Sequence, residues 1–259
     1  MSGTSSTAVR AIGPILGALM LAATGCAKSG GDPFAVTPNT APASAPSGNP
    51  GAAGAPVTTS APPNRTPEQA QALATSIALT PEDWGTGFVK QSTYEFAGKT
   101  WTDYAADCTQ QTVPLAPSII GQWVRQVQLP DAAQPNTLSS GSTSTIVHKD
   151  ARGAHDQVQN AHQVKDRCPT RTYTDGTQAK DTPGAAQPVF PEADEVFAEE
   201  GTMNLKSGGI PYVYVVVTVR KEAVAMSAYF SAPGADRLPD VRTRTVQAAR
   251  LMLDRLLRA

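Results

Sequence analysis

Cysteine is scarce in this sequence, with three residues in a chain of 259, and no two of them form a Cys-x-x-Cys pair. Zinc sites built on cysteine usually need such a pair, so no metal site is expected from these residues. No charge of either sign dominates, because 21 basic residues face 22 acidic ones. Nucleic-acid-binding domains carry clustered basic residues, and we therefore expect no nucleic-acid partner.

The signatures of several enzyme classes are also missing. The sequence has no Gly-x-Ser-x-Gly elbow, no phosphate-binding glycine loop, no His-Glu-x-x-His and no calcium-loop pattern. Two pairs of neighbouring carboxylates occur, Asp194-Glu195 and Glu199-Glu200, but neighbours on a strand point to opposite faces. The hydroxyl-rich stretch 139–145 is interpreted as a flexible loop. We expect a protein that is not an enzyme and that needs no cofactor.

Long apolar runs are absent apart from residues 11–23, about thirteen residues that include Pro14. This run is too short to cross a bilayer of roughly 30 Å as a helix. It follows Arg10 and ends in the small residues of Ala23-Thr24-Gly25-Cys26, the pattern of a cleaved export signal. We predict a lipoprotein signal peptide over 1–25 and acylation of Cys26; a permanent membrane anchor and a cleaved signal without lipid are the alternatives.

Composition changes after Cys26. Charged residues are absent from 33–64, where Pro, Ala, Ser, Thr and Gly dominate. Such a segment has too little apolar surface to offset the entropy of ordering, so residues 26–66 are predicted to be a disordered tether. A folded domain is predicted over 67–259, held on the extracytoplasmic face of the cell membrane by its lipid.

Two cysteines remain once Cys26 is acylated. Cys108 and Cys168 form an even pair in an oxidising compartment, where pairing is the default. A disulfide between them is the preferred interpretation, and a metal site or a catalytic thiol is the alternative.

Apolar periodicity predicts an α+β domain, in which a mainly antiparallel sheet packs against helices laid on one side. Strand 211–219 is apolar on both faces and should be central, paired with 223–230 in a hairpin and with 194–205 on its other side. A strand over 123–129 is expected to have one solvated face. The predicted helices span 66–77, 101–111, 150–168 and 240–257, and further strands are predicted at 88–96 and 143–148.

Polar and aromatic residues supply the candidate contacts. The histidines at 148, 155 and 162 are interpreted as residues flanking a buried helix stripe, because two helical turns separate His155 from His162. Arginines on the last helix indicate a solvated face or, alternatively, a contact with anionic lipids or envelope polymers. Ligand pockets are mostly apolar and aromatic, so the candidate pocket lining is Trp101, Tyr104, Trp123, Tyr212 and Tyr214.

The order of these features resembles a known group. The turn Leu79-Thr80-Pro81-Glu82-Asp83, Cys108, the helix start at 149–151, Cys168-Pro169, the Val-rich strand pair and the terminal helix follow one another along 77–257. The chain is similar to actinobacterial lipoproteins whose exported domain resembles the extracellular sensor domain of PknH-type serine/threonine kinases. The resemblance implies a curved antiparallel sheet on helices, with a cleft for an unidentified ligand.

Together these observations predict a lipid-anchored, non-catalytic sensor or ligand-binding protein. Its expected partners are the membrane, through the lipid, and a small molecule, glycolipid or envelope protein. A carrier of a lipid or envelope precursor is one alternative, and a structural interaction protein without a pocket is another.

Overall fold

The computed structural model describes residues 64–130 and 138–259. The predicted signal peptide, Cys26 and nearly all of the predicted tether lie outside these residues. The described elements are α1 (Pro67–Ile77), α2 (Pro81–Trp84), β1 (Val89–Phe96), β2 (Thr100–Tyr104), β3 (Gln110–Pro114), β4 (Ile119–Pro130), β5 (Leu138–His148), α3 (Ala151–Arg167), β6 (Thr170–Thr172), β7 (Gln178–Asp181), β8 (Glu195–Asn204), β9 (Tyr212–Lys221), β10 (Val224–Pro233), the short 3₁₀ helix Ala235–Arg237 and α4 (Leu238–Arg258).

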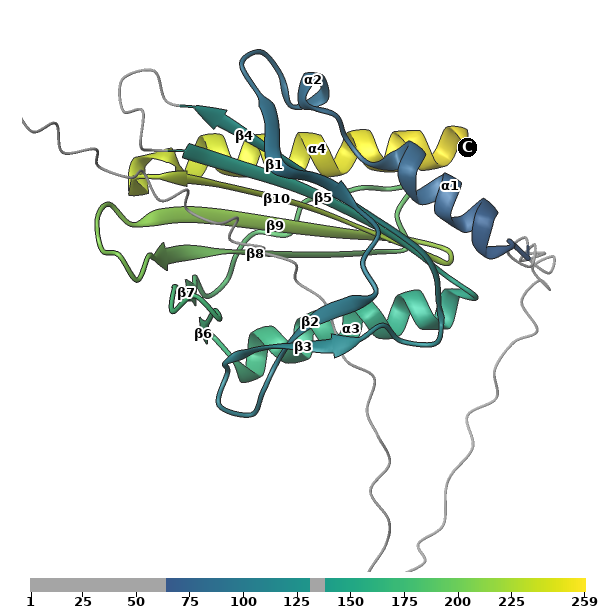
Figure 1. The fold of residues 1–259 in the computed structure, drawn as a ribbon, viewed down its shortest axis with the longest axis horizontal. Helices are drawn as coiled ribbons and strands as arrows, with labels where there is room; N and C mark the ends of the chain where they lie inside the picture. The colour runs from purple at the N-terminus through teal and green to yellow at the C-terminus, as the bar shows by residue number, and fades with distance from the viewer. Residues whose placement is uncertain (1–63, 131–137) are drawn as a thin grey trace, which may run out of the picture. The chain divides into compact units, whose positions relative to one another are not determined.

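One antiparallel sheet organises these elements (Figure 1). Its strand order is β1-β4-β5-β10-β9-β8-β7-β6, while β2 and β3 form a separate hairpin. β9 pairs with β10 from Tyr212↔Pro233 to Lys221↔Val224, and with β8 on its other side. The predicted α+β fold and the central position of β9 are confirmed.

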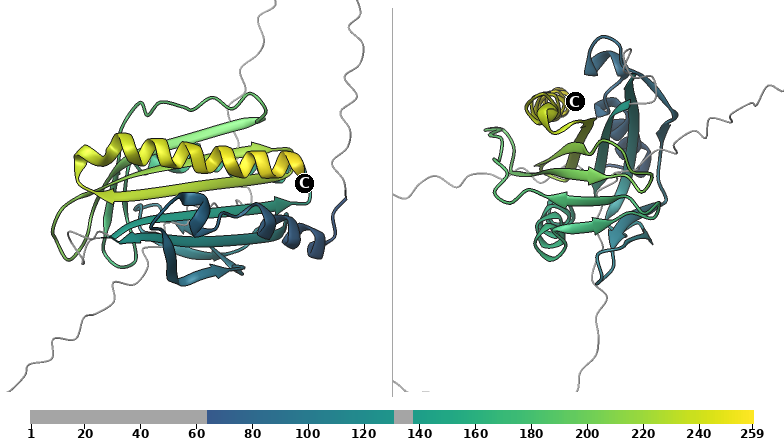
Figure 2. Two further views of the ribbon diagram at one scale, coloured as in Figure 1. Left: turned by 90° about the horizontal axis from the view of Figure 1, so that it is seen from above. Right: turned by 90° about the vertical axis from the view of Figure 1, so that its left-hand side faces the viewer.

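Helices cover both faces of the sheet, not one as predicted. Val213, Val215, Val217 and Val219 of β9 pack in one cluster with residues of α1 and α4. Tyr214 and Val216, which alternate with them, pack on the opposite face with Val164 of α3. The left view of Figure 2 shows α4 lying over the strands. In Figure 1, α3 lies below the strands. The all-apolar character of β9 follows from this double cover.

Local signals set the ends of the helices. Thr66 and Gln69 form a capping box at the start of α1, with Pro67 in the first turn, and the Asp150 side chain accepts from the Gly153 N–H to cap α3. In α4, the positions Val241, Thr245, Ala248 and Met252 are buried, and Leu256 is partly buried against the same core; these five residues share the face that an amphipathic helix over 240–257 predicts. No helix among the described residues is long and apolar enough to span a membrane.

Three local predictions are wrong. Residues 101–111 form most of the β2–β3 hairpin and not a helix, because Trp101 pairs with Val113 and Tyr104 with Gln110. Residues 139–145 belong to β5 and not to a loop. The strand over 123–129 has no solvated face, since Val124 and Gln126 are buried and Trp123 and Arg125 are half-buried.

Candidate functional site

The sheet face on the side of α3 is polar along β4 and β5. Side chains alternate along each strand, so Gln122, Val124 and Gln126 share one face of β4. In the register of the two strands, Val124 lies opposite Ser144, and Gln126 lies opposite Ser142. Ser144 is therefore a diagonal neighbour of both glutamines, within about 8 Å. Gln122, Gln126 and Ser144 are all more than nine-tenths buried.

The β2–β3 hairpin covers this polar stretch. Trp101 of β2 is buried and packs against Ile146, which lies opposite Gln122 in the β4–β5 register. The turn before β2 approaches so closely that a Cβ on Gly98 would lie 3.0 Å from Gln122 Oε1. Asp103 is buried on the same side of β2 as Trp101 and accepts a hydrogen bond from Gln111 Nε2.

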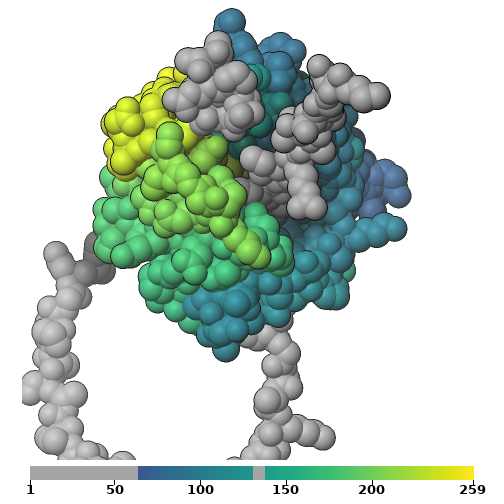
Figure 3. Space-filling view, turned by 60° about the vertical axis from the view of Figure 1, so that its left-hand side comes forward, coloured from purple at the N-terminus to yellow at the C-terminus, as the bar shows by residue number. Residues whose placement is uncertain are grey.

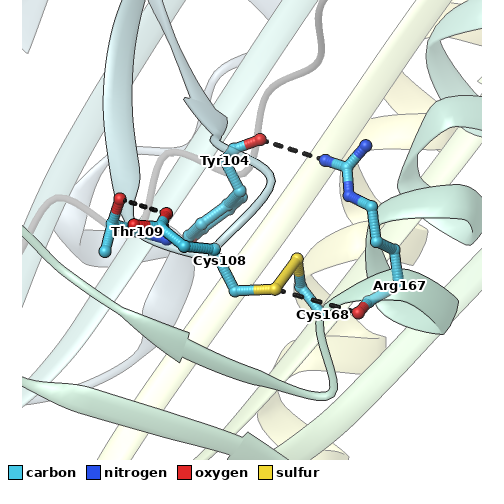
Figure 4. The surroundings of a disulfide bond; sticks show 6 residues. Tyr104, Cys108, Thr109, Arg167 and Cys168 are labelled. Carbon is cyan, nitrogen blue, oxygen red and sulfur yellow. Dashed lines mark hydrogen bonds between the residues drawn. A yellow bond between two sulfur atoms is a disulfide. The ribbon is translucent and has the colours of Figure 1, made fainter.

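A disulfide fixes the far end of the hairpin to α3. Cys108 and Cys168 are joined, with their Cα atoms 5.4 Å apart, which confirms the pairing predicted from the sequence. Beside the bridge, Arg167 Nη2 donates to the Tyr104 carbonyl at 3.0 Å (Figure 4). In the space-filling view the hairpin, in blue, packs directly against the green residues of α3 and its surroundings (Figure 3).

Four neutral polar atoms of this region have no hydrogen-bond partner among the described residues. They are Trp101 Nε1, Gln122 Oε1, Gln126 Oε1 and Ser144 Oγ, which together we call the polar patch. A buried polar group left unpaired costs about 1–3 kcal/mol, so such groups are normally paired with protein, water or ligand. Trp123 Nε1 and Thr145 Oγ1 are also unpaired, on the opposite face of the sheet.

A charged cluster occupies the other end of the same face. Arg171 of β6 is fully buried and donates to Glu199 of β8 at 2.9 and 3.4 Å. Its guanidinium also donates to Asp181 and, at 3.0 Å, to the Tyr214 hydroxyl, which in turn donates to Asp181. The Arg171 guanidinium lies 5.5 Å from the centre of the Tyr104 ring, so the hairpin covers this cluster too.

Burial governs protonation in the cluster. Loss of water raises the pKa of Glu199 above 4.5, and the nearby charge of Asp181 adds to the rise, although Arg171 opposes it. Burial is also the main cause of the raised pKa of the Tyr214 hydroxyl. Since buried ion pairs gain little net free energy, the cluster is better explained as a specific junction of β6, β7 and β8 than as a source of stability.

Four of the five predicted lining residues lie on this face. Tyr104 and Tyr214 are buried in one cluster with Tyr212 packed against it, and Trp101 is buried beside Ile146. Trp123 is the exception, because it packs into the core on the side of α1 and α4. The sequence analysis did not identify Gln122, Gln126, Arg171 or Asp181, whose only signal is that they are polar residues within strands. Glu199 and the hydroxyl-rich stretch that contains Ser144 were noticed but interpreted as having no role in a site.

The remaining polar candidates have structural contacts. His148 Nε2 lies 2.6 Å from Gln157 Oε1, and burial lowers the pKa of His148. His155 pairs with Glu195, and the His162 ring lies 4.6 Å from that of Phe197. Among the described residues no cluster of His, Cys, Asp or Glu is suited to a metal ion.

Arginines of α4 pair within the domain. Arg242 contacts Glu200, Arg244 contacts Asp240, Arg250 contacts Glu192 and Asp254, and Arg255 contacts Asp83. Glu199 and Glu200 thus have partners on opposite faces of the sheet, as the alternation of a strand predicts. Because these side chains are partly exposed, each pair contributes at most about 1 kcal/mol.

Comparison with known proteins adds no assignment. No protein-family model matches the chain. No curated protein sequence matches it either.

Proposed function

We propose that this chain is an exported, lipid-anchored binding protein without catalytic activity, and that its ligand is small, uncharged and rich in hydroxyl groups. The polar patch is the observation that carries this proposal. It presents one indole N–H donor, two amide carbonyl oxygens and one hydroxyl, all buried and all without a hydrogen-bond partner among the described residues. A ligand that paired with these groups would recover the free energy that their burial costs.

The chemistry of the patch favours hydroxyl groups over charged groups. None of its four atoms belongs to an ionised side chain. Amide carbonyls accept hydrogen bonds from hydroxyls, and the Asp103 carboxylate on the same side of β2 can accept more. An indole beside amides and a carboxylate suits a sugar or a polyol, which alternates apolar C–H groups with hydroxyls. The head group of a glycolipid has the same chemistry.

The cellular setting is part of the same proposal. Acylation of Cys26 would hold the domain on the extracytoplasmic face of the membrane, and the disulfide is consistent with an oxidising compartment. The resemblance to the sensor domains of PknH-type kinases implies a ligand-binding role, and it supports the proposal only as a resemblance.

The test is a titration of the ¹⁵N-labelled domain, residues 64–259, first shown to be folded, with glucose, mannose, galactose and myo-inositol. We expect at least one probe to shift the Trp101 indole N–H resonance in a saturable manner. Ser144→Ala and Gln126→Leu should abolish the shift without loss of stability, because each removes an unpaired polar atom. Thr145→Val is the matched control on the opposite face, and it should leave binding unchanged.

Two outcomes would count against the proposal. One is the absence of a saturable shift with every probe; the other is equal loss of binding in Thr145→Val. Binding of an intact glycolipid but of none of its free sugars would favour the alternative of a lipid carrier.

A further inference from the structure

A cavity of about 120 Å³ lies on the opposite face of the sheet, between β8, β9, α4 and residues 185–188. Its walls are mainly apolar and include Val215 and Val217 of β9, Val246 of α4, Ala198 of β8 and Pro188. The odd-numbered residues of β9 face α4, whereas the polar patch lies on the side of α3. The cavity is therefore separate from the proposed ligand site.

The charged groups at the cavity balance each other. Arg242 Nε and Nη2 donate to the two carboxylate oxygens of Glu200, both at 2.9 Å. Both residues line the cavity, and so does Glu199, whose carboxylate pairs with Arg171 on the opposite face of the sheet. Such a two-bond pair satisfies the charge of each partner, so the cavity wall offers no net charge to attract an ion.

Residues 185–188 form the outer wall of the cavity, and the Gln187 side chain holds them to β8 by the same two hydrogen bonds that a neighbouring strand would make. The Gln187 side-chain amide donates to the Ala198 carbonyl at 2.9 Å and accepts from the Ala198 N–H at 2.6 Å. β7 pairs with β8 only over Gly201–Asn204, so Gln187 occupies the edge of β8 that β7 leaves unpaired. Phe190, three residues later, is buried in the main core. The segment 185–190 is thus anchored at two points and forms a fixed wall.

We propose that this cavity binds one small, uncharged, apolar molecule, such as an aromatic ring or a branched hydrocarbon of about six carbon atoms. Enclosed apolar cavities of about 150 Å³ in proteins accept benzene. The cavity here has a volume of about 120 Å³ and is partly open to solvent, which gives a ligand a route in. Apolar walls, a balanced ion pair and a fixed outer segment suit such a ligand better than an ion or a sugar. This site does not depend on the proposed function of the polar patch.

Benzene is the probe that tests this inference, in a methyl-labelled sample of the folded chain. We expect saturable shifts of the methyl resonances of Val215, Val217 and Val246, while those of Val216, on the opposite face, stay unchanged. Ala198→Leu places a larger side chain in the cavity and should abolish the shifts. Ala106→Leu, at an exposed position of the β2–β3 turn, is the matched control and should bind benzene as the wild type does.

The benzene titration of the wild type tests the inference even if the Ala198→Leu variant fails to fold. Shifts that do not saturate, or that affect Val216 as much as Val217, would overturn the inference. So would undiminished binding by a folded Ala198→Leu variant. A negative result with sugars leaves this experiment unaffected, so the two proposals fail independently.

Discussion

The guanidinium of Arg171 is fully buried, and the side chains of two acidic residues, Asp181 and Glu199, contact it. Glu199 and Asp181 contact the same guanidinium, and both are more than nine-tenths buried. A buried charge is tolerated only when it is paired and hydrogen-bonded. Burial and the nearby charge of Asp181 raise the pKa of Glu199, although Arg171 and Lys165 oppose the rise, so Glu199 keeps its proton to a higher pH than a free carboxyl does.

Because Glu199 holds its proton more tightly in the folded state, the free energy of unfolding should depend on pH through this residue. The folded state retains a proton that Glu199 releases in the unfolded chain above its ordinary pKa of 4.5. The contribution of Glu199 to the free energy of unfolding should therefore fall as pH rises from 4.5 towards the raised pKa. Glu199→Gln imitates the protonated acid, and it should gain stability relative to the wild type over this range. Urea unfolding of both proteins between pH 4.5 and 8 measures the difference; parallel curves would contradict the prediction.

The hairpin is the element on which the candidate site depends. The contacts that hold β2–β3 over the sheet include Trp101 against Ile146, Tyr104 against Tyr173 with ring centres 6.4 Å apart, and the disulfide from Cys108 to Cys168. β2 and β3 are not strands of the large sheet, although the hairpin turn is joined to β6 by the hydrogen bond from the Thr172 N–H to the Cys108 carbonyl, at 3.0 Å. It is therefore expected to be the part of the cover whose position relies most on the covalent link.

Removal of the disulfide should loosen this element first. The two cysteines are separated by 60 residues, and closing such a loop stabilises the folded state by roughly 4 kcal/mol on chain-entropy grounds. We expect Cys108→Ser/Cys168→Ser to lose about that amount, measured by urea unfolding. Hydrogen exchange should show lost protection in β2 and β3 while β9 and β10 keep theirs. Uniform loss of protection throughout the sheet would show that the disulfide does not act on the hairpin in particular.

The helix predicted over 101–111 is wrong for a physical reason. Trp101, Tyr104 and Cys108 lie three and four residues apart, which is the spacing of a helix face. In a five-residue strand, Trp101 and Asp103 point to one side and Tyr104 to the other, yet Tyr104 is still buried because it faces Tyr173 near the disulfide. Short strands covered from both sides produce helix-like spacing by coincidence.

The whole molecule is predicted to be attached to the membrane through a lipid on Cys26. Acylation of Cys26, which lies outside the described residues, should anchor the mature chain to the membrane, because two or three acyl chains give lasting attachment. We expect the wild type expressed in a lipoprotein-exporting bacterium to partition into the detergent phase. Cys26→Ser should lose the lipid mass and leave that phase. An unmodified Cys26 in the intact mass of the wild type would contradict the prediction.

The sequence alone determined the elements whose signals are local. The capping box at Thr66, the amphipathic period of α4 and the doubly apolar β9 each depend on residues close together in the chain. The disulfide was also predictable, because two cysteines in an oxidising compartment allow one pairing. The polar patch and the Arg171 cluster were decided only by the tertiary structure. Their members come from strands and turns as far apart as residues 101 and 144, or 171 and 214. The members of the polar patch and of the Arg171 cluster are close in space because of the strand register and because helices cover both faces of the sheet. Neither of these features produces a periodic pattern in the sequence.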